Sequence, residues 1–176
     1  HQKYTFTSQD TFALTFSSST LDNVGGISKF LSIVANILEW SWSLPLDAAL
    51  KFRLVAFVHH FGEDTWLAPN PTTFWNVIES HPSRITLEQA IDSGQLFFFA
   101  KNQLPFRSSI EMLQISSVHL FWQAPLTSTR ALYSPMACGC FVIAADTEPA
   151  RALIVHGKNG LLVDPKNDVG AITQIV

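Results

Sequence analysis

The stretch that most constrains the fold is residues 131–164, where short hydrophobic runs alternate with turn and helix-start signals. Residues 140–145 (CFVIAA) form a continuous apolar run of the length expected for a strand buried on both faces. Before this run, residues 134–139 are predicted as a small-residue turn that lets a helix pass close beneath the strand. A buried strand beside a helix is the beginning of an α/β unit.

The second half of this stretch completes the unit. Asp146 or Thr147 is predicted to cap a helix, and Pro149 suits its first turn because a nitrogen without hydrogen is tolerated there. A glycine-bounded turn at residues 157–160 then leads into a short strand at 161–163. Helix, strand, helix, turn and strand together predict parallel strand pairing.

The rest of the chain repeats this alternation. Further strands are predicted at residues 4–7, 12–17, 53–61, 96–100 and 118–123, and further helices at 28–43, 74–80, 87–93, 108–116 and 169–176. Strands that alternate with helices imply an α/β fold with a doubly wound, mostly parallel, Rossmann-like sheet. At this length, residues 1–176 are expected to form one domain.

Composition limits the partners that the chain can have. The net charge is −3 and basic residues are scattered, so a nucleic acid is not an expected partner. No apolar run reaches the length of a transmembrane segment and no signal peptide is visible, which predicts a cytoplasmic protein. Only 14% of the residues are charged, which predicts either packing against something larger or poor solubility of the chain alone. Both ends look like cut ends of a longer chain.

Neither a metal nor a cofactor is expected. Cys138 and Cys140 stand too close in sequence to bridge readily and lack further ligands nearby, so they are predicted to be buried thiols. His59 and His60 are adjacent on a predicted strand and therefore face opposite ways, which favours packing over an acid–base pair. His119 is predicted to be a hydrogen-bonded histidine of the core.

The same stretch carries a resemblance. It is similar to the signature region of the GT-B glycosyltransferases of group 1, which transfer sugars from nucleotide diphosphates with retention. The similarity runs without a gap through Met136, Ala137, Cys138, Gly139, Val142, Ile143, Asp146, Thr147 and residues 156–164. It implies the C-terminal, donor-binding half of a two-domain fold, whose acceptor-binding half is absent from this chain. The implied ligand is a UDP-, GDP- or ADP-linked sugar, and an acceptor-binding domain or another protein is a possible partner.

In an open α/β sheet, ligands bind beyond the carboxyl ends of the strands. A nucleotide sugar needs backbone N–H groups for its diphosphate, cations for the leaving phosphate and acceptors for its hydroxyl groups. Together with the resemblance, this predicts donor-binding residues in the loops at that edge: Gly25, Gly26, Gly62, Glu63, Leu104, Thr127, Ser128, Thr129, Arg130 and Ser134. No residue is predicted to be catalytic.

This sequence departs from the family pattern at several positions. The two glutamates of the family fall on Leu126 and Ser134, and neither residue is acidic. The phosphate-binding Arg and Lys are sought after the strand that ends near residues 62–64, but no Arg or Lys stands between Arg53 and Arg84. Pro135 is expected to disturb the entry of the helix that carries the Met-Ala-Cys-Gly motif, because proline lacks a backbone donor.

Three readings of the sequence remain open. The chain is either the donor-binding domain of a glycosyltransferase or a degenerate, non-catalytic relative kept as a structural or docking module. The third reading is an unrelated flavodoxin-like or epimerase-like fold, and the order of strands in the sheet would decide that alternative.

Overall fold

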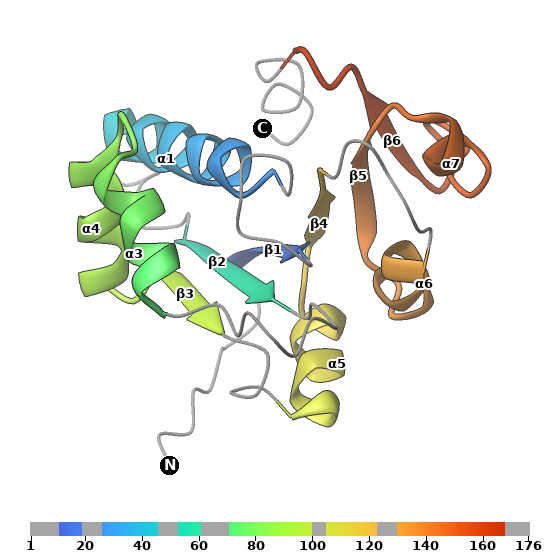
Figure 1. Ribbon diagram of the computed structural model, residues 1–176, viewed down its shortest axis with the longest axis horizontal. Helices are drawn as coiled ribbons and strands as arrows, with labels where there is room; N and C mark the ends of the chain where they lie inside the picture. Colours follow the sequence, from blue (N-terminus) through green and yellow to red (C-terminus); the bar gives the residue numbers. More distant parts are fainter. Residues whose placement is uncertain are drawn as a thin grey trace.

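The fold was analysed in a computed structural model, which describes residues 11–18, 26–45, 53–60, 71–99, 105–122 and 130–167. Six parallel strands form one sheet in the order β3-β2-β1-β4-β5-β6 (Figure 1). They are β1 (Thr11–Ser18), β2 (Arg53–His60), β3 (Leu96–Phe99), β4 (Val118–Phe121), β5 (Phe141–Ala145) and β6 (Gly160–Val163). This confirms the predicted doubly wound parallel sheet, and the order is that of dinucleotide-binding folds. The flavodoxin-like alternative is wrong, because β1 neighbours β4 rather than β3.

Helices cover both faces of the sheet (Figure 1). Their bounds are α1 (Ile27–Ser43), α3 (Pro71–Glu79), α4 (Arg84–Asp92), α5 (Phe106–Gln114), α6 (Arg130–Ala137) and α7 (Glu148–Arg151). The first three share one hydrophobic cluster with side chains of all six strands, whereas α6 and α7 pack against alternate residues of β4 and β5. Met112 of α5 joins a third cluster with β1 and β2 on that second face. None of the described helices is long and apolar enough to cross a bilayer.

Helix α1 is the main hydrophobic element of the first face. Its buried stripe includes Phe30, whose ring stacks on Phe16 of β1 with 4.9 Å between the ring centroids. The helix ends at Ser43, because Leu44 adopts an extended conformation before Pro45, as a residue that precedes proline prefers. His81 ties the connection between α3 and α4 to the first turns of α1. Its Nδ1 accepts the N–H of Ser83, so Nε2 carries the proton that it can share with α1.

Two glycines are required where backbones touch. Gly26 precedes α1 with a φ of 76°, and a Cβ built on it would lie 2.1 Å from the carbonyl oxygen of Trp122. Gly160 begins β6, where a Cβ would lie 2.6 Å from the carbonyl oxygen of Val142. Both contacts are far inside van der Waals distance, so any side chain at these positions would push two strand-bearing segments apart. The glycine that ends the turn at residues 157–160 therefore has a packing role.

The region around α6 differs from the sequence prediction. Residues 134–137 form the end of a helix rather than a turn, and the turn is confined to Cys138 and Gly139. Arg130, expected in a loop, is the first residue of that helix. Pro135 therefore lies in its second half and does not disturb its entry. The helix tolerates this proline and closes beyond it, because Cys138 and Cys140 donate to the carbonyls of Ser134 and Pro135.

The other boundaries agree with the predictions to within a few residues. Thr147 is the N-cap of α7, but its side chain makes no capping hydrogen bond and its Oγ1 is buried without a partner among the described residues. The carboxylate of Asp146 binds Arg151 instead. The strand predicted at residues 4–7 and the helix at 169–176 lie outside the described residues.

Candidate functional site

The sheet has its topological switch point between β1 and β4. Strand β1 pairs with β2 along all of Thr11–Ser18, but with β4 only at Leu14, Thr15 and Phe16. Beyond Phe16 and its partner Leu120, the two strands continue without pairing. Because α1, the helix after β1, and α6, the helix after β4, lie on opposite faces of the sheet, a crevice for a ligand is expected at the carboxyl ends of these two strands.

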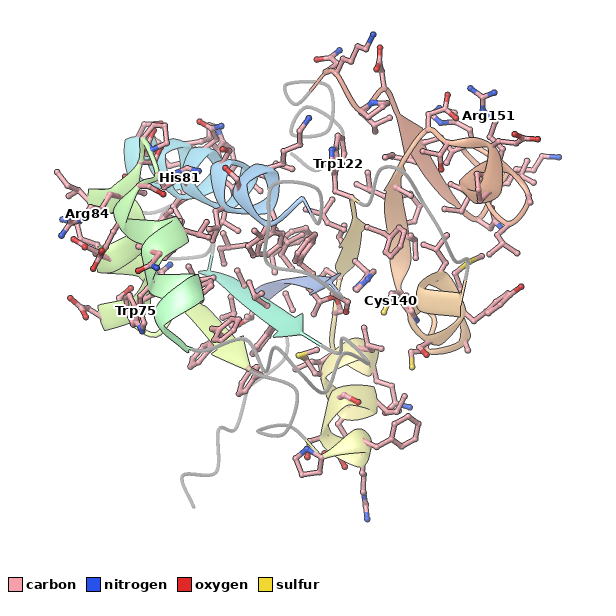
Figure 2. All side chains as sticks on the ribbon, in the orientation of Figure 1. Trp75, His81, Arg84, Trp122, Cys140 and Arg151 are labelled. Atoms are coloured by element: carbon pink, nitrogen blue, oxygen red, sulfur yellow. The ribbon has the colours of Figure 1, made fainter. Side chains whose placement is uncertain are left out.

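The first turn of α1 would form one wall of this expected crevice. Gly26 is buried, and its α-carbon packs on the backbone of Trp122, the residue that follows β4. Trp122 is only 4% exposed and belongs to the same hydrophobic cluster as α1; Figure 2 shows it at the end of β4, beside the start of α1. The space between α1 and the end of β4 is thus filled on this face, so a ligand would have to sit above the indole.

Lys29 places a positive charge over this wall. It is the third residue of α1, and its Nζ lies 5.4 Å from the centroid of the Trp122 ring. The same ammonium donates a hydrogen bond to the carbonyl oxygen of Pro165, 2.5 Å away, in the segment after β6. The first turn of α1 contains no acidic residue. A helix amino terminus with a lysine and no carboxylate favours anions electrostatically.

Arg151 is a second cation near the carboxyl ends of the strands, and it is already paired with a carboxylate. Arg151 of α7 binds the carboxylate of Asp146 through two hydrogen bonds of 2.6 and 2.9 Å. This bidentate contact holds the pKa of Asp146 below its usual value, chiefly through the hydrogen bond from Arg151. Both side chains are exposed enough for solvent to screen the pair. Arg151 would have to leave Asp146 before it could contact a phosphate.

Three of the predicted donor-binding residues fall within the described segments. Gly26 lies at the crevice wall, as above. Ser134 lies on α6 with its side chain exposed, at the position where the resemblance expects a glutamate. Arg130 opens α6, but its side chain is outside the described part. The remaining positions also lie outside it, and their roles stay predictions: Gly25, Gly62, Glu63, Leu104, Thr127, Ser128 and Thr129.

A buried polar chain joins β1 and β4 on the face of the sheet opposite α1, and the sequence analysis did not identify it. The hydroxyl of Thr15 lies 2.9 Å from Nδ1 of His119 and 2.7 Å from the hydroxyl of Ser116. His119 is fully buried, and its Nε2 has no hydrogen-bond partner in the described structure. The prediction of a hydrogen-bonded core histidine is therefore right for one ring nitrogen and wrong for the other. Burial lowers the pKa of His119 to about 3, so the ring is neutral.

Other residues that the sequence analysis missed are Lys29 and Trp122. A signal was present for both, since Lys29 follows a Gly-Gly pair and Trp122 ends an apolar strand pattern. Sequence alone did not reveal that the two side chains meet. His59 and His60 end β2, but their side chains are outside the described part. Within the described segments, no three His, Cys, Asp or Glu residues are grouped so that they could hold a metal ion.

Comparison with solved structures identifies the fold. The C-terminal domain of the group 1 glycosyl transferase LpcC from Francisella tularensis matches 96% of this chain over 74% of its own length. The TM-score is 0.63 and the sequence identity 16%. The chain has the fold of a GT-B glycosyltransferase domain. This confirms the fold that the resemblance of residues 131–164 implied.

Complete glycosyltransferase chains match in the same way. A glycosyltransferase from Rickettsia africae ESF-5 matches 93% of this chain over 36% of its own, with a TM-score of 0.66 and 13% identity. HepE from Anabaena, solved in complex with UDP-glucose, matches 94% of this chain over 38% of its own, with a TM-score of 0.60 and 19% identity. This chain thus spans little more than a third of those proteins. No protein-family profile matches it, and no curated protein matches it in sequence.

Proposed function

We propose that this chain is a donor-binding domain that holds a nucleotide-diphosphate sugar for transfer to an acceptor. The observation that carries the proposal is the switch point between β1 and β4, where the first turn of α1 has no acidic residue and Lys29 lies over Trp122. A diphosphate carries the negative charge that such a wall attracts. The fold shared with HepE, solved with UDP-glucose, supports the same ligand class.

The donor would lie above Trp122, with its diphosphate toward the first turn of α1. Lys29 would exchange the carbonyl of Pro165 for a phosphate oxygen, since a charged acceptor makes the stronger hydrogen bond. Ser134 would contribute a neutral hydroxyl where the family uses a carboxylate. UDP, GDP and ADP remain alternatives for the nucleotide. We further propose that the protein acts in the cytoplasm, which its two free cysteines support.

Isothermal titration with UDP-, GDP- and ADP-linked sugars tests this proposal. One nucleotide class should bind, and Lys29→Met should weaken its binding about tenfold or more, because a hydrogen bond to a charged group contributes roughly 1.5–3 kcal/mol. Lys158→Met is the matched control. Lys158 lies in the turn that precedes β6, at the amino end of that strand, whereas the donor is expected at the carboxyl ends. Absence of binding by all three classes, or equal losses in the two variants, would contradict the proposal.

A non-catalytic structural or docking module is the second candidate. The serine at position 134 favours it, because a hydroxyl cannot replace a carboxylate as a charged acceptor for ribose. The partner would be an acceptor-binding domain or another protein.

Two measurements together distinguish the two candidates. Native mass spectrometry reports the assembly state, and donor titration of a variant with a carboxylate at position 134 reports whether the donor site works. A docking module should appear as a stable complex or oligomer and should bind no donor. If the domain retains donor binding, Ser134→Glu should tighten it, whereas the neutral Ser134→Gln should not. A monomer that binds a nucleotide sugar would eliminate the docking candidate.

A further inference from the structure

The hydrogen bonds of the buried polar chain fix the position of one proton. The hydroxyl of Ser116 lies 2.8 Å from the carbonyl oxygen of Val118, an atom that can only accept, so Ser116 donates there. Thr15 then donates to Ser116 at 2.7 Å, and Nδ1–H of His119 donates to Thr15 at 2.9 Å. Other carbonyl contacts of these hydroxyls are longer, at 3.5 Å. The second ring nitrogen, Nε2, therefore carries a bare lone pair.

This lone pair is sealed inside the protein. His119 lies in the sheet register between Thr15 of β1 and Val142 of β5, and its exposed fraction is 0%. Nε2 has no described partner, and burial is the cause of the lowered pKa. A proton added at Nε2 would create a buried N–H without an acceptor and a buried charge without a counter-charge. Each of these is strongly unfavourable in a protein interior.

The elements around the ring offer no compensating charge. Neither β1 nor β5 contains a titratable side chain. Arg107 and Glu111 of α5 are exposed and pair with each other. The remaining titratable residues on or beside the covering helices α6 and α7 are Arg130, with a side chain outside the described part, exposed Tyr133, the thiols of Cys138 and Cys140, exposed Glu148, and the ion pair of Asp146 with Arg151. Burial raises the pKa of Cys140 to about 11, so its thiol stays neutral and donates to the carbonyl of Leu113.

The ring also sits at the seam between β1 and β4, which is the shortest strand pairing in the described sheet. Strands β1 and β4 are paired at only three positions, and the Thr15–His119 pair is the central one. The connection at Ser116 and Ser117 strengthens this seam from below, because Ser117 exchanges hydrogen bonds with the backbone of Ala13. Opening the seam would expose His119 to water and allow it to titrate normally.

We propose that His119 is an acid-sensitive latch on the seam between β1 and β4. When the seam is closed the ring must remain neutral, and when the seam opens the ring can take up a proton from water. Acid therefore favours the open form, and the β1–β4 half of the sheet separates before the β2–β3 half. No titratable group other than this imidazole is needed, and the proton goes from solvent to Nε2.

The size of the effect follows from linkage. The open form titrates near the ordinary histidine pKa of 6.5, whereas the closed form titrates near 3. Above pH 6.5 neither form is protonated, and the opening equilibrium does not depend on pH. Below it, the population of the open form rises about tenfold per pH unit until the closed form also takes up a proton. Between pH 7.5 and pH 4.5 this amounts to roughly a hundredfold.

Hydrogen exchange followed residue by residue tests the latch. Protection factors, which correct for the pH dependence of intrinsic exchange, should fall roughly a hundredfold from pH 7.5 to 4.5 for the amides of β4. They should change little for the amides of β2 that point toward β3, such as Ala56, which donates to the carbonyl of Gln95, and Val58 two residues further on. Constant protection in β4 would overturn the proposal, and so would an equal fall in both strands, which would indicate global unfolding.

Variants separate titration from packing. His119→Gln cannot titrate but keeps a polar group near Thr15, so the pH dependence in β4 should disappear. Thr15→Val removes the hydroxyl but leaves the ring, so protection should fall at every pH while its pH dependence remains. A pH dependence that survives in His119→Gln would assign it to another group and overturn the latch. If His119→Gln does not fold, the comparison of β4 with β2 in the natural protein still decides.

Discussion

Replacing Gly26 by alanine should cost far more than an ordinary glycine replacement. Two costs combine there. The positive φ of 76° is a left-handed conformation, which costs a residue with a Cβ roughly 1–2 kcal/mol. The new Cβ would also lie 2.1 Å from the carbonyl oxygen and 2.8 Å from the Cβ of Trp122. Forced overpacking of this kind costs about 1–3 kcal/mol, so we expect a total loss of roughly 2–5 kcal/mol.

The chain contains glycines that separate the two costs. Gly139 has a φ of 82° and nothing within 4 Å of a built Cβ, so Gly139→Ala measures the conformational cost alone. Gly160 lacks a positive φ but would place its Cβ 2.6 Å from Val142, so Gly160→Ala measures the overpacking alone. The loss in Gly26→Ala should approach the sum of the other two losses, unless the backbone relaxes.

Urea unfolding followed by circular dichroism measures all three losses as free energies of unfolding. The slope of the transition should stay constant, since none of the changes alters the surface exposed on unfolding by much. Equal losses in Gly26→Ala and Gly139→Ala would refute the close contact between α1 and Trp122. That outcome would also remove the indole as the floor of the proposed donor crevice.

Two further predictions concern the turn before β6 and the cysteines. Asn159→Ala should lower the free energy of unfolding by about 1–2 kcal/mol, because its side chain makes two hydrogen bonds to backbone groups; Lys158→Ala, on the same turn, is the control and should change little. In the native protein at pH 8, Ellman's reagent should modify partly exposed Cys138 and spare Cys140, whose thiol is buried with a pKa of about 11. Peptide mapping identifies the modified residue, and equal rates at both thiols would contradict the buried position of Cys140.

The sequence predicted the layers of the fold better than its contacts. Strand positions followed from apolar runs such as residues 140–145, because a strand buried on both faces needs consecutive hydrophobic residues. The end of α6 was misjudged, since Ser134, Pro135 and Gly139 individually favour turns and only packing against β5 keeps the first two helical. Local preference is a weak guide where tertiary packing competes with it.

The candidate site was less accessible to sequence reasoning. Gly26 was found because a glycine pair before a helix is a local signal. The contact of Lys29 with Trp122 joins residues that are far apart in the chain, and no local pattern reports it. His119 was expected to have its hydrogen bonds satisfied, which is the rule for buried polar groups. The unpaired Nε2 is an exception to that rule, and no local sequence pattern reports it.

The central position of β1 has a consequence for biosynthesis. One edge of β1 pairs with β2, and the other pairs with β4, which begins at residue 118. Leu14 therefore pairs with Val118, a residue that is synthesised 104 positions later. At translation rates of roughly 5–20 residues per second, the open edge of β1 persists for about 5–20 seconds on the ribosome. An uncovered apolar strand edge is where chains adhere to one another. The nascent chain therefore has its greatest need of a chaperone while the segment between β2 and β4 is being synthesised.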